Sequence, residues 1–324
     1  MDLKRMFLMT RLIAALICLQ AVSAAAAAEG SFQRTLAVNG SANIDLTTGS
    51  GSVQVRTGDA NQVQISAHIK VSNWLGGDAE KKIEEIEKNP PIQQSGSDIR
   101  IGHGTDSELF HNVSVSYELV VPPQTQLRSQ TGSGHQTIEG LQRALEVQTG
   151  SGGLKISDIG GPVRADTGSG DIEVDRVNGD VRARAGSGSI HANSVSGGFD
   201  GHTGSGHITL DQTAPGTVRA ETGSGGMDLR GVKGSLDATA GSGTITAEGD
   251  PTGSWRVHTG SGGVRLKLTS AGFNLDARTS SGSISVSQPV TVQGQLNKRE
   301  IRGKVNGGGV LIDVDTGSGN IEIQ

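Results

Sequence analysis

The sequence predicts an all-β protein, a single-domain parallel β-solenoid with coils of about 18 residues and an N-terminal cap that contains one short helix. The first observation is a tetrapeptide, Thr-Gly-Ser-Gly, that recurs every 18 or 19 residues along most of the chain, twice as Ala-Gly-Ser-Gly. Its first glycines are Gly132, Gly150, Gly168, Gly186, Gly204, Gly223, Gly241 and Gly260, with an earlier copy at Gly49 and a last one at Gly317. A unit repeated at fixed period cannot bury its apolar face alone and must stack on copies of itself.

The second observation is a set of apolar columns, which appears when each copy is numbered from its first residue. Apolar residues recur at the sixth, eighth, eleventh, fifteenth and seventeenth places, and the fifteenth place contains Val181 and Leu236. Alternation between places six and eight, and between fifteen and seventeen, is typical of strands with one buried face. We therefore expect two or three short parallel strands per coil, with Val181 and Leu236 pointing inward. The seventeenth place is mostly alanine, which indicates an interior too narrow for a ligand cavity.

The corners of the coil are expected where the apolar phase slips, at Gly-Ser-Gly and again near the tenth place. Glycine adopts positive φ without a steric penalty, and we expect this property to explain most of the 50 glycines. First-place threonines form one column, which we interpret as a hydroxyl ladder that supports the corner. They are Thr131, Thr149, Thr167, Thr203, Thr222, Thr259, Thr279 and Thr316.

Residues 1–28 are typical of a cleaved export signal, with basic residues before an apolar stretch that is too short to span a bilayer. Ala24 or Ala28 closes a small-residue cleavage site. Cys18, the only cysteine, lies in this segment, so the exported chain would have no disulfide and no thiol chemistry. We expect a periplasmic, extracellular or cell-surface protein with no transmembrane anchor in its mature chain.

Two further segments follow from the pattern. Residues 29–130 predict an N-terminal cap and the first strands, with a helix at about 78–88 that starts after Asp78 and stops at Asn89. Residues 131–324 predict the regular solenoid, with an irregular insertion at about 288–306 where the period breaks.

Composition argues against several kinds of site. A net charge of −5 with both signs interspersed gives no nucleic-acid footprint. A calcium-binding β-roll needs aspartates at its corners, and Asp171 is the single aspartate that directly follows Gly-Ser-Gly. The eight histidines are scattered, and charges at the outward sixteenth place alternate in sign as structural cross-strand pairs would. We predict no catalytic residues, no metal site and no cofactor.

The C-terminal part contains the one basic cluster, formed by Lys298, Arg299, Arg302 and Lys304. We interpret it as a solvated, exposed loop, and a partner- or anion-binding patch is the alternative. The repeat runs to Gln324 with no capping segment after it, which predicts an open coil at residues 320–324. Either residues 288–306 fold back over this end or a second protein molecule covers it, and the basic character of residues 295–304 favours the second. Because exposed strand edges pair with other chains, we expect self-association or partner binding through this C-terminal coil.

Three features together resemble one protein family. They are the Gly-Ser-Gly-x-Ile-x-Val repeats, an acidic helix before Val-Ser-Tyr-Glu-Leu-Val-Val-Pro, and a closing Asn-Gly-Gly-Gly block followed by Thr-Gly-Ser-Gly. This combination is similar to the bacterial putative-adhesin family, also called the DUF4097 β-strand-repeat family, over about residues 35–324. The resemblance implies the repeat fold and an adhesin-like role, and it brings no catalytic residues.

The sequence thus predicts a non-enzymatic exported binding scaffold whose partner is an envelope protein or a glycan. Two alternatives stay open. One is a lyase or hydrolase that acts on polysaccharides, since larger β-helices have such activities on an outer face. The other is a component of envelope-stress signalling.

Folding should be independent of calcium, because the corner carboxylates of a calcium-binding roll are missing. Adding EGTA to the purified protein should leave both its circular dichroism spectrum and its melting temperature unchanged. A marked shift in either quantity would contradict this prediction.

Overall fold

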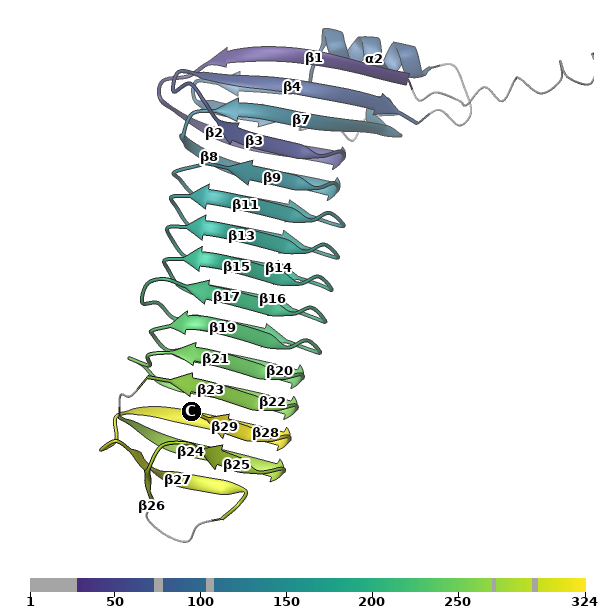
Figure 1. Cartoon of the computed structure of the whole chain (residues 1–324). Coiled ribbons are helices and arrows are strands. Elements are labelled where there is room, and N and C mark those ends of the chain that lie inside the picture. Colours follow the sequence, from purple (N-terminus) through teal and green to yellow (C-terminus); the bar gives the residue numbers. More distant parts are fainter. Residues whose placement is uncertain (1–27, 73–77, 103–107, 270–271, 293–296) are drawn as a thin grey trace, which may run out of the picture.

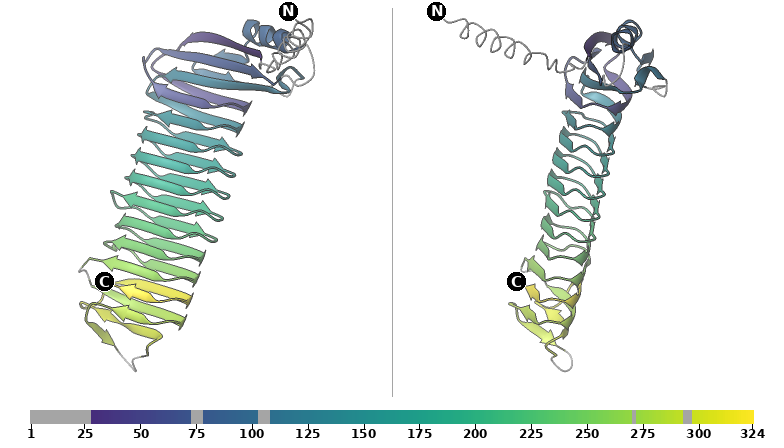
Figure 2. Two further views of the ribbon diagram at one scale, coloured as in Figure 1. Left: turned by 45° about the vertical axis from the view of Figure 1, so that its right-hand side comes forward. Right: turned by 90° about the vertical axis from the view of Figure 1, so that its right-hand side faces the viewer.

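The computed structural model describes residues 28–72, 78–102, 108–269, 272–292 and 297–324. The export signal predicted at residues 1–28 therefore lies, apart from Ala28, outside the described residues. The chain winds into an elongated rod of two facing sheets, and each regular coil contributes one strand to each sheet (Figures 1 and 2). With 14 and 15 strands per sheet and a strand spacing of ~4.8 Å, the rod is about 60 Å long. The β-solenoid fold is confirmed, with two strands per coil.

Sheet A contains, in spatial order, β1 (Ala28–Ala37), β4 (Gln62–Val71), β7 (Val113–Val121), β3 (Val53–Thr57), β9 (Gln136–Glu139), β11 (Leu154–Ile159), β13 (Ile172–Val177), β15 (Ile190–Val195), β17 (Ile208–Gln212), β19 (Met227–Val232), β21 (Ile245–Gly249), β23 (Val264–Leu268), β29 (Ile321–Ile323) and β25 (Ile284–Val286). Sheet B contains β26 (Val290–Val292), β27 (Glu300–Val305), β24 (Phe273–Ser281), β28 (Val310–Ser318), β22 (Trp255–Ser261), β20 (Leu236–Ser242), β18 (Val218–Thr222), β16 (Phe199–Thr203), β14 (Val181–Ala185), β12 (Val163–Thr167), β10 (Leu145–Thr149), β8 (Gln124–Ser133), β2 (Ser41–Ser50), β6 (Asp98–Ile101) and β5 (Ile92–Ser95). Helix α2 spans Ala79–Lys88, and a short 3-10 helix, η1, spans Glu108–Phe110.

The core is the narrow layer between the two sheets, filled by the inward columns of the repeat. Val181 and Leu236 are 1% and 2% exposed, so their predicted inward direction is confirmed. The alanines of the seventeenth place are fully buried, as Ala183 shows. Where Gly201 replaces alanine, the ring of Phe199 occupies the space, because a Cβ at Gly201 would lie 2.5 Å from the ring.

The Thr-Gly-Ser-Gly corner, which leads from sheet B to sheet A, is held by the threonine hydroxyl. Thr167 Oγ1 donates to the carbonyl of Gly152 in the preceding coil at 2.9 Å, and it accepts from Gly170 N of its own corner at 3.1 Å. Equivalent donor bonds are made by Thr149, Thr203, Thr222, Thr259, Thr279 and Thr316. The predicted hydroxyl ladder is therefore confirmed, and it links each coil to the one before it in space.

Glycine is needed at this corner mainly because successive coils approach closely. A Cβ at Gly150 would lie 2.4 Å from the carbonyl oxygen of Gly132, and one at Gly152 only 1.8 Å from that of Gly134. Few of these glycines have positive φ, Gly243 being one, at 146°. The expectation that positive φ explains most glycines is thus wrong for this corner, where backbone-to-backbone contact leaves no room for a side chain.

The opposite corner, from sheet A back to sheet B, is where left-handed backbone occurs. The tenth place has φ between 55° and 57° at Asp158, Arg176 and Ser194, and it is a glycine with positive φ at Gly140 and Gly231. A left-handed non-glycine residue costs roughly 1–2 kcal/mol. The repetition of this conformation in successive coils shows that the turn geometry, rather than the residue type, determines it.

The N-terminal end is closed by strands that depart from the coil order. β3 lies between β7 and β9, and β2 lies between β6 and β8, so the first coil is held on both sides by strands that come later in the chain. At the edge of sheet A, β4 pairs antiparallel with β7, and β1 pairs antiparallel with β4.

Helix α2 lies over β1 at this end (Figure 1). The side chains of Ile83 and Ile86 on this helix are buried. Glu87 Oε1, also on the helix, accepts a hydrogen bond from Ser31 N of β1 at 2.8 Å. The edge strand β1 is therefore partly blocked against pairing with another chain. Asp78 occupies the N-cap position, but its side chain makes no capping hydrogen bond.

The C-terminal strands do not lie at the end of the rod. β28 pairs with β22 on one side and β24 on the other, and β29 pairs with β23 and β25. Residues 310–324 thus form a coil inserted between two earlier ones, which is why Thr316 donates to Gly262 O and Thr279 to Gly319 O. The prediction of an open coil at residues 320–324 is wrong, because both edges of β29 are paired.

Residues 288–306 contain a hairpin, β26–β27, instead of an exposed loop. β27 pairs antiparallel with β24 and extends sheet B beyond the last coil. Arg302 Nε lies 3.3 Å from Asp276 Oδ1 and 3.1 Å from Glu300 Oε1, and these carboxylates offset the positive charge that suggested a loop. Self-association through the C-terminal coil stays a prediction, now without the open edge that motivated it.

The hydroxyl ladder can be tested by removing one rung and adding another. Thr167→Val should lower the free energy of unfolding by about 1–3 kcal/mol, because the carbonyl of Gly152 and the amide of Gly170 lose their partner. Ala185→Thr should supply a missing rung and raise it by roughly 0.5–1.5 kcal/mol. Denaturant unfolding measures both, and Thr239→Val on the outer face is the control. Equal effects of Thr167→Val and Thr239→Val would contradict the ladder.

The cap formed by β27 should weaken in acid. The hydrogen bond from Arg278 and the charge of Arg302 hold the pKa of Asp276 below its usual value of 3.8. A carboxylate with a lowered folded pKa stabilises the fold above the unfolded pKa and loses this effect as pH falls through the folded pKa. Asp276→Asn should therefore lower the melting temperature at pH 7, and its difference from the wild type should shrink below pH 3.8. An equal difference in melting temperature at pH 7 and in acid would contradict this role. The control is Asp78→Asn, because the side chain of Asp78 is 80% exposed.

Candidate functional site: the outer face of sheet B

In the described part of the chain, four grooves lie on the outer face of sheet B. The largest of these four, about 860 Å³, runs beside the Thr-Gly-Ser-Gly corners from β2 to β16, and we call it the corner groove. Apart from Arg164, its outward-pointing lining on β8 to β16 comes from the eighteenth place of successive repeats. These residues are Gln130, Gln148, Asp166, Arg184 and His202.

The three smaller grooves, of about 370, 490 and 580 Å³, follow one another along the opposite ends of the strands. The first two share Arg128, and the second and third share Arg182. A ridge of sixteenth-place side chains separates them from the corner groove. The repeat thus produces two parallel hollows that follow the long axis of the rod.

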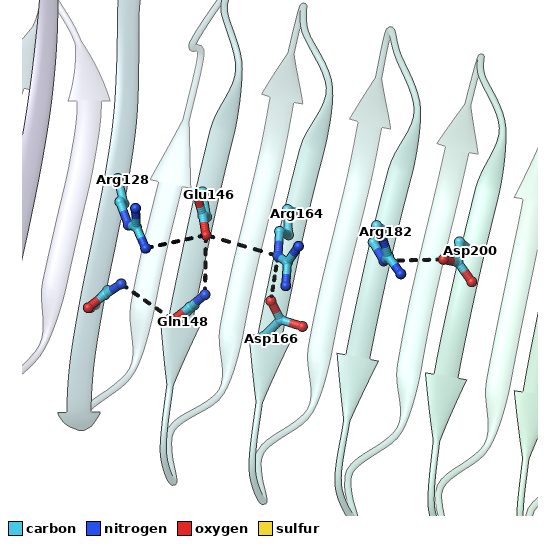
Figure 3. A network of polar contacts seen from close by, with 8 residues as sticks. Arg128, Glu146, Gln148, Arg164, Asp166, Arg182 and Asp200 are labelled. Carbon is cyan, nitrogen blue, oxygen red and sulfur yellow. Dashed lines mark hydrogen bonds and ion pairs between the residues drawn. The ribbon is translucent and has the colours of Figure 1, made fainter.

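The ridge between the grooves is a ladder of ion pairs between neighbouring strands (Figure 3). Its pairs join Arg128 to Glu146 at 3.8 Å, Arg164 to Glu146 at 4.0 Å, Arg182 to Asp200 at 3.2 Å, Arg219 to Asp237 at 3.5 Å and Arg256 to Asp313 at 3.9 Å. The structural role that alternating charge predicted is confirmed for these pairs. Because all of these side chains are at least partly exposed, salt screens the pairs and the contribution of each to stability is small.

The alternation breaks at more than one step of the ridge, and one of these steps lies between β12 and β14. Arg164 and Arg182 are register partners there, and Asp166 is the register partner of Arg184. Asp166 turns to Arg164 at 2.9 Å, a hydrogen bond that raises the pKa of Arg164. Within the described part of the chain, Arg184 is exposed and has neither an ion pair nor a hydrogen bond to its side chain.

The basic cluster predicted from the sequence lies at the last hairpin, and its residues are not among those that line the four grooves. Lys298 and Arg299 are in the turn before β27, and Arg302 and Lys304 are on the strand. All four residues are exposed, and Arg302 is also paired with two carboxylates, as described above. A partner-binding role for this cluster stays a prediction.

Histidines lie beside single carboxylates. His207 Nε2 is 2.9 Å from Asp228 Oδ2, and His202 Nδ1 is 3.4 Å from Glu221 Oε2. Among the described residues, no group of three or more His, Cys, Asp or Glu side chains is placed to hold a metal ion. Across the same residues, no helix has the length and apolar character needed to cross a membrane.

The carboxyl groups whose pKa is shifted are all shifted downward by a basic neighbour. Hydrogen bonds from Lys88, Arg176, Arg278 and Arg265 lower the pKa of Glu84, Asp158, Asp276 and Glu322, respectively. Each of these groups is therefore held as a carboxylate. That state suits an ion pair and is the reverse of what a general acid requires.

Arg184 and the corner groove are the features that sequence reasoning missed. The signal was present, because the sixteenth place reads arginine in two successive repeats, at Arg164 and Arg182. The sequence does not show whether Asp166 pairs with Arg164 or with Arg184. In the structure its side chain turns to Arg164, and Arg184 is left without an ion pair within the described residues.

Comparison with known proteins gives one family match. The Toastrack DUF4097 family model matches residues 162–324, half of the chain. Two solved structures match the chain, each at 11% identity over 91% of its length. A protein described as a putative adhesin from Bacteroides fragilis is covered over 97% of its length with a TM-score of 0.32, and a putative cell adhesion protein from Clostridium sporogenes over 99% with a TM-score of 0.20. No curated protein sequence matches significantly.

The repeat register, the two-sheet coil and the family match lead to one conclusion: the chain belongs to the Toastrack DUF4097 family.

Proposed function

We propose that this protein is a non-enzymatic binding scaffold of the cell envelope or cell surface, and that its binding face is the outer face of sheet B. The observation that carries the proposal is the position of the four grooves described above, which lie on this face and follow the rod axis. The sequence pattern of residues 1–28, typical of an export signal, supports the location outside the cytoplasm.

The rod suits binding of an extended partner. Its two sheets share one continuous core, and each internal strand has hydrogen-bonded neighbours on both sides, so the face does not need to order itself on binding. A preformed face saves the entropy that a flexible site would lose. Adhesin-like binding to an envelope protein or glycan is the function that fits such a face best.

The chemistry of the face supports binding rather than catalysis. Glycoside cleavage by two carboxyl groups needs one of them protonated near neutral pH, in a site that raises its pKa. On this face, the ridge carboxylates of Glu146 and Asp200 and the groove carboxylate of Asp166 are instead paired with arginines.

The binding face can be tested by blocking one sheet at a time. In a Cys18→Ser background, Gln148→Cys places a single thiol on the sheet B face, and Ser157→Cys places one on sheet A at a similarly half-buried position. Both are coupled to a bulky maleimide polymer, and binding to a panel of immobilised polysaccharides and envelope proteins is measured. We expect the label at residue 148 to abolish binding and the label at residue 157 to leave it intact.

The same panel decides between the scaffold and the enzyme. Bound polysaccharide should show no new reducing ends after long incubation. Release of reducing ends by the wild type would identify a hydrolase or lyase instead, and equal binding by both labelled proteins would place the binding face elsewhere.

A further inference from the structure

Three guanidinium groups meet on β12 and β14, where the charge ladder breaks. Arg164 and Arg182 are in register on neighbouring strands, and each has its own carboxylate, Asp166 and Asp200. Arg184 has none within the described residues. Like charges directly opposite in a sheet are destabilising, and a local departure from favourable pairing is common at functional sites.

We infer that the corner groove binds an acidic polysaccharide and that Arg184 holds one of its carboxylate or sulfate groups. This inference rests on the proposed function, because it assigns a ligand class to the same face. A guanidinium presents two parallel donors that match the two oxygens of such a group, and charge-assisted bonds of this kind are about twice as strong as neutral ones. His202, the register partner of Arg184 on β16, lines the same groove beside it.

The groove lining favours a sugar chain over a peptide. Its side chains are hydroxyls, amides and charged groups, such as Thr47, Gln130 and Gln148, and Ala185 is the one apolar side chain among those that line it. Many peptides are recognised through apolar anchor pockets or by addition to a free strand edge, and acidic peptides by arginine clusters. The strands under this groove are paired on both sides, so no edge is offered, whereas hydroxyl and amide groups suit a polyhydroxylated chain.

The length of the groove favours a polymer. It crosses six strands, from β2 to β16, and five spacings of ~4.8 Å give about 24 Å. Arg184 lies near the end of this path on β14, so one charged group of the chain is fixed there while neighbouring sugars lie over the amides of β8 and β10.

The inference is tested with the full-length protein and labelled oligogalacturonate, a carboxylate-bearing sugar chain. The same oligomer with its carboxylates reduced, a sulfated dextran oligomer and poly-glutamate are the comparison probes. Arg184→Gln is matched by Arg230→Gln, which removes an exposed arginine without an ion pair from the outer face of sheet A. Binding is measured by fluorescence anisotropy at low and high salt, and melting curves establish that both variants fold.

We expect salt-sensitive binding of the oligogalacturonate, loss of binding for its reduced form, an affinity about tenfold weaker for Arg184→Gln, and no change for Arg230→Gln. The sulfated oligomer shows whether carboxylate or sulfate is preferred. Equal affinities of the two variants would overturn the inference, as would tighter binding of poly-glutamate, which would indicate an acidic peptide. If Arg184→Gln has no effect while the polymer label at residue 148 still abolishes binding, the outer face of sheet B remains the binding face, and the inference that Arg184 binds an acidic polysaccharide is wrong.

Discussion

The contact on which this structure depends is the approach of one Thr-Gly-Ser-Gly corner to the next. The glycine backbones touch at a distance that excludes any Cβ, and the threonine hydroxyl joins the two coils by bonding to both. This contact fixes the vertical offset between coils. The corner contact therefore sets the register of every other column of the repeat, buried or exposed. This is why residues 18 positions apart are neighbours in successive coils.

That regularity also makes the outer face of sheet B a surface of columns. Side chains two residues apart on one strand fall into separate rows, one forming the charged ridge and the other the lining of the corner groove. A charged residue that lacks an ion-pair partner in one row therefore stays without one, because the register fixes which side chains are its neighbours. Arg184 is such a residue, and its isolation follows from the direction that Asp166 takes.

Much of the body could be predicted from the sequence, because the period determines which residues share a column. The burial of Val181 and Leu236 and the hydroxyl ladder follow from local spacing. The two ends could not, because every coil carries the same pattern and each could stack beside any other. Which coil neighbours which is decided by long-range pairing, as where β28 contacts β22 across 57 positions, from Trp255 to Ile312. The spacing of the repeat also does not predict which arginine each carboxylate of the ridge pairs with.

The insertion of the C-terminal coil between two earlier ones changes how the rod would respond to force. A solenoid whose last coil lies at its end can be unwound from that end, one ladder at a time. Tension applied at Gln324 instead acts on β29, which is bonded to β23 on one side and β25 on the other, so both ladders must break together. Two ladders loaded in parallel resist more than one, and the chain end is thereby anchored inside the rod.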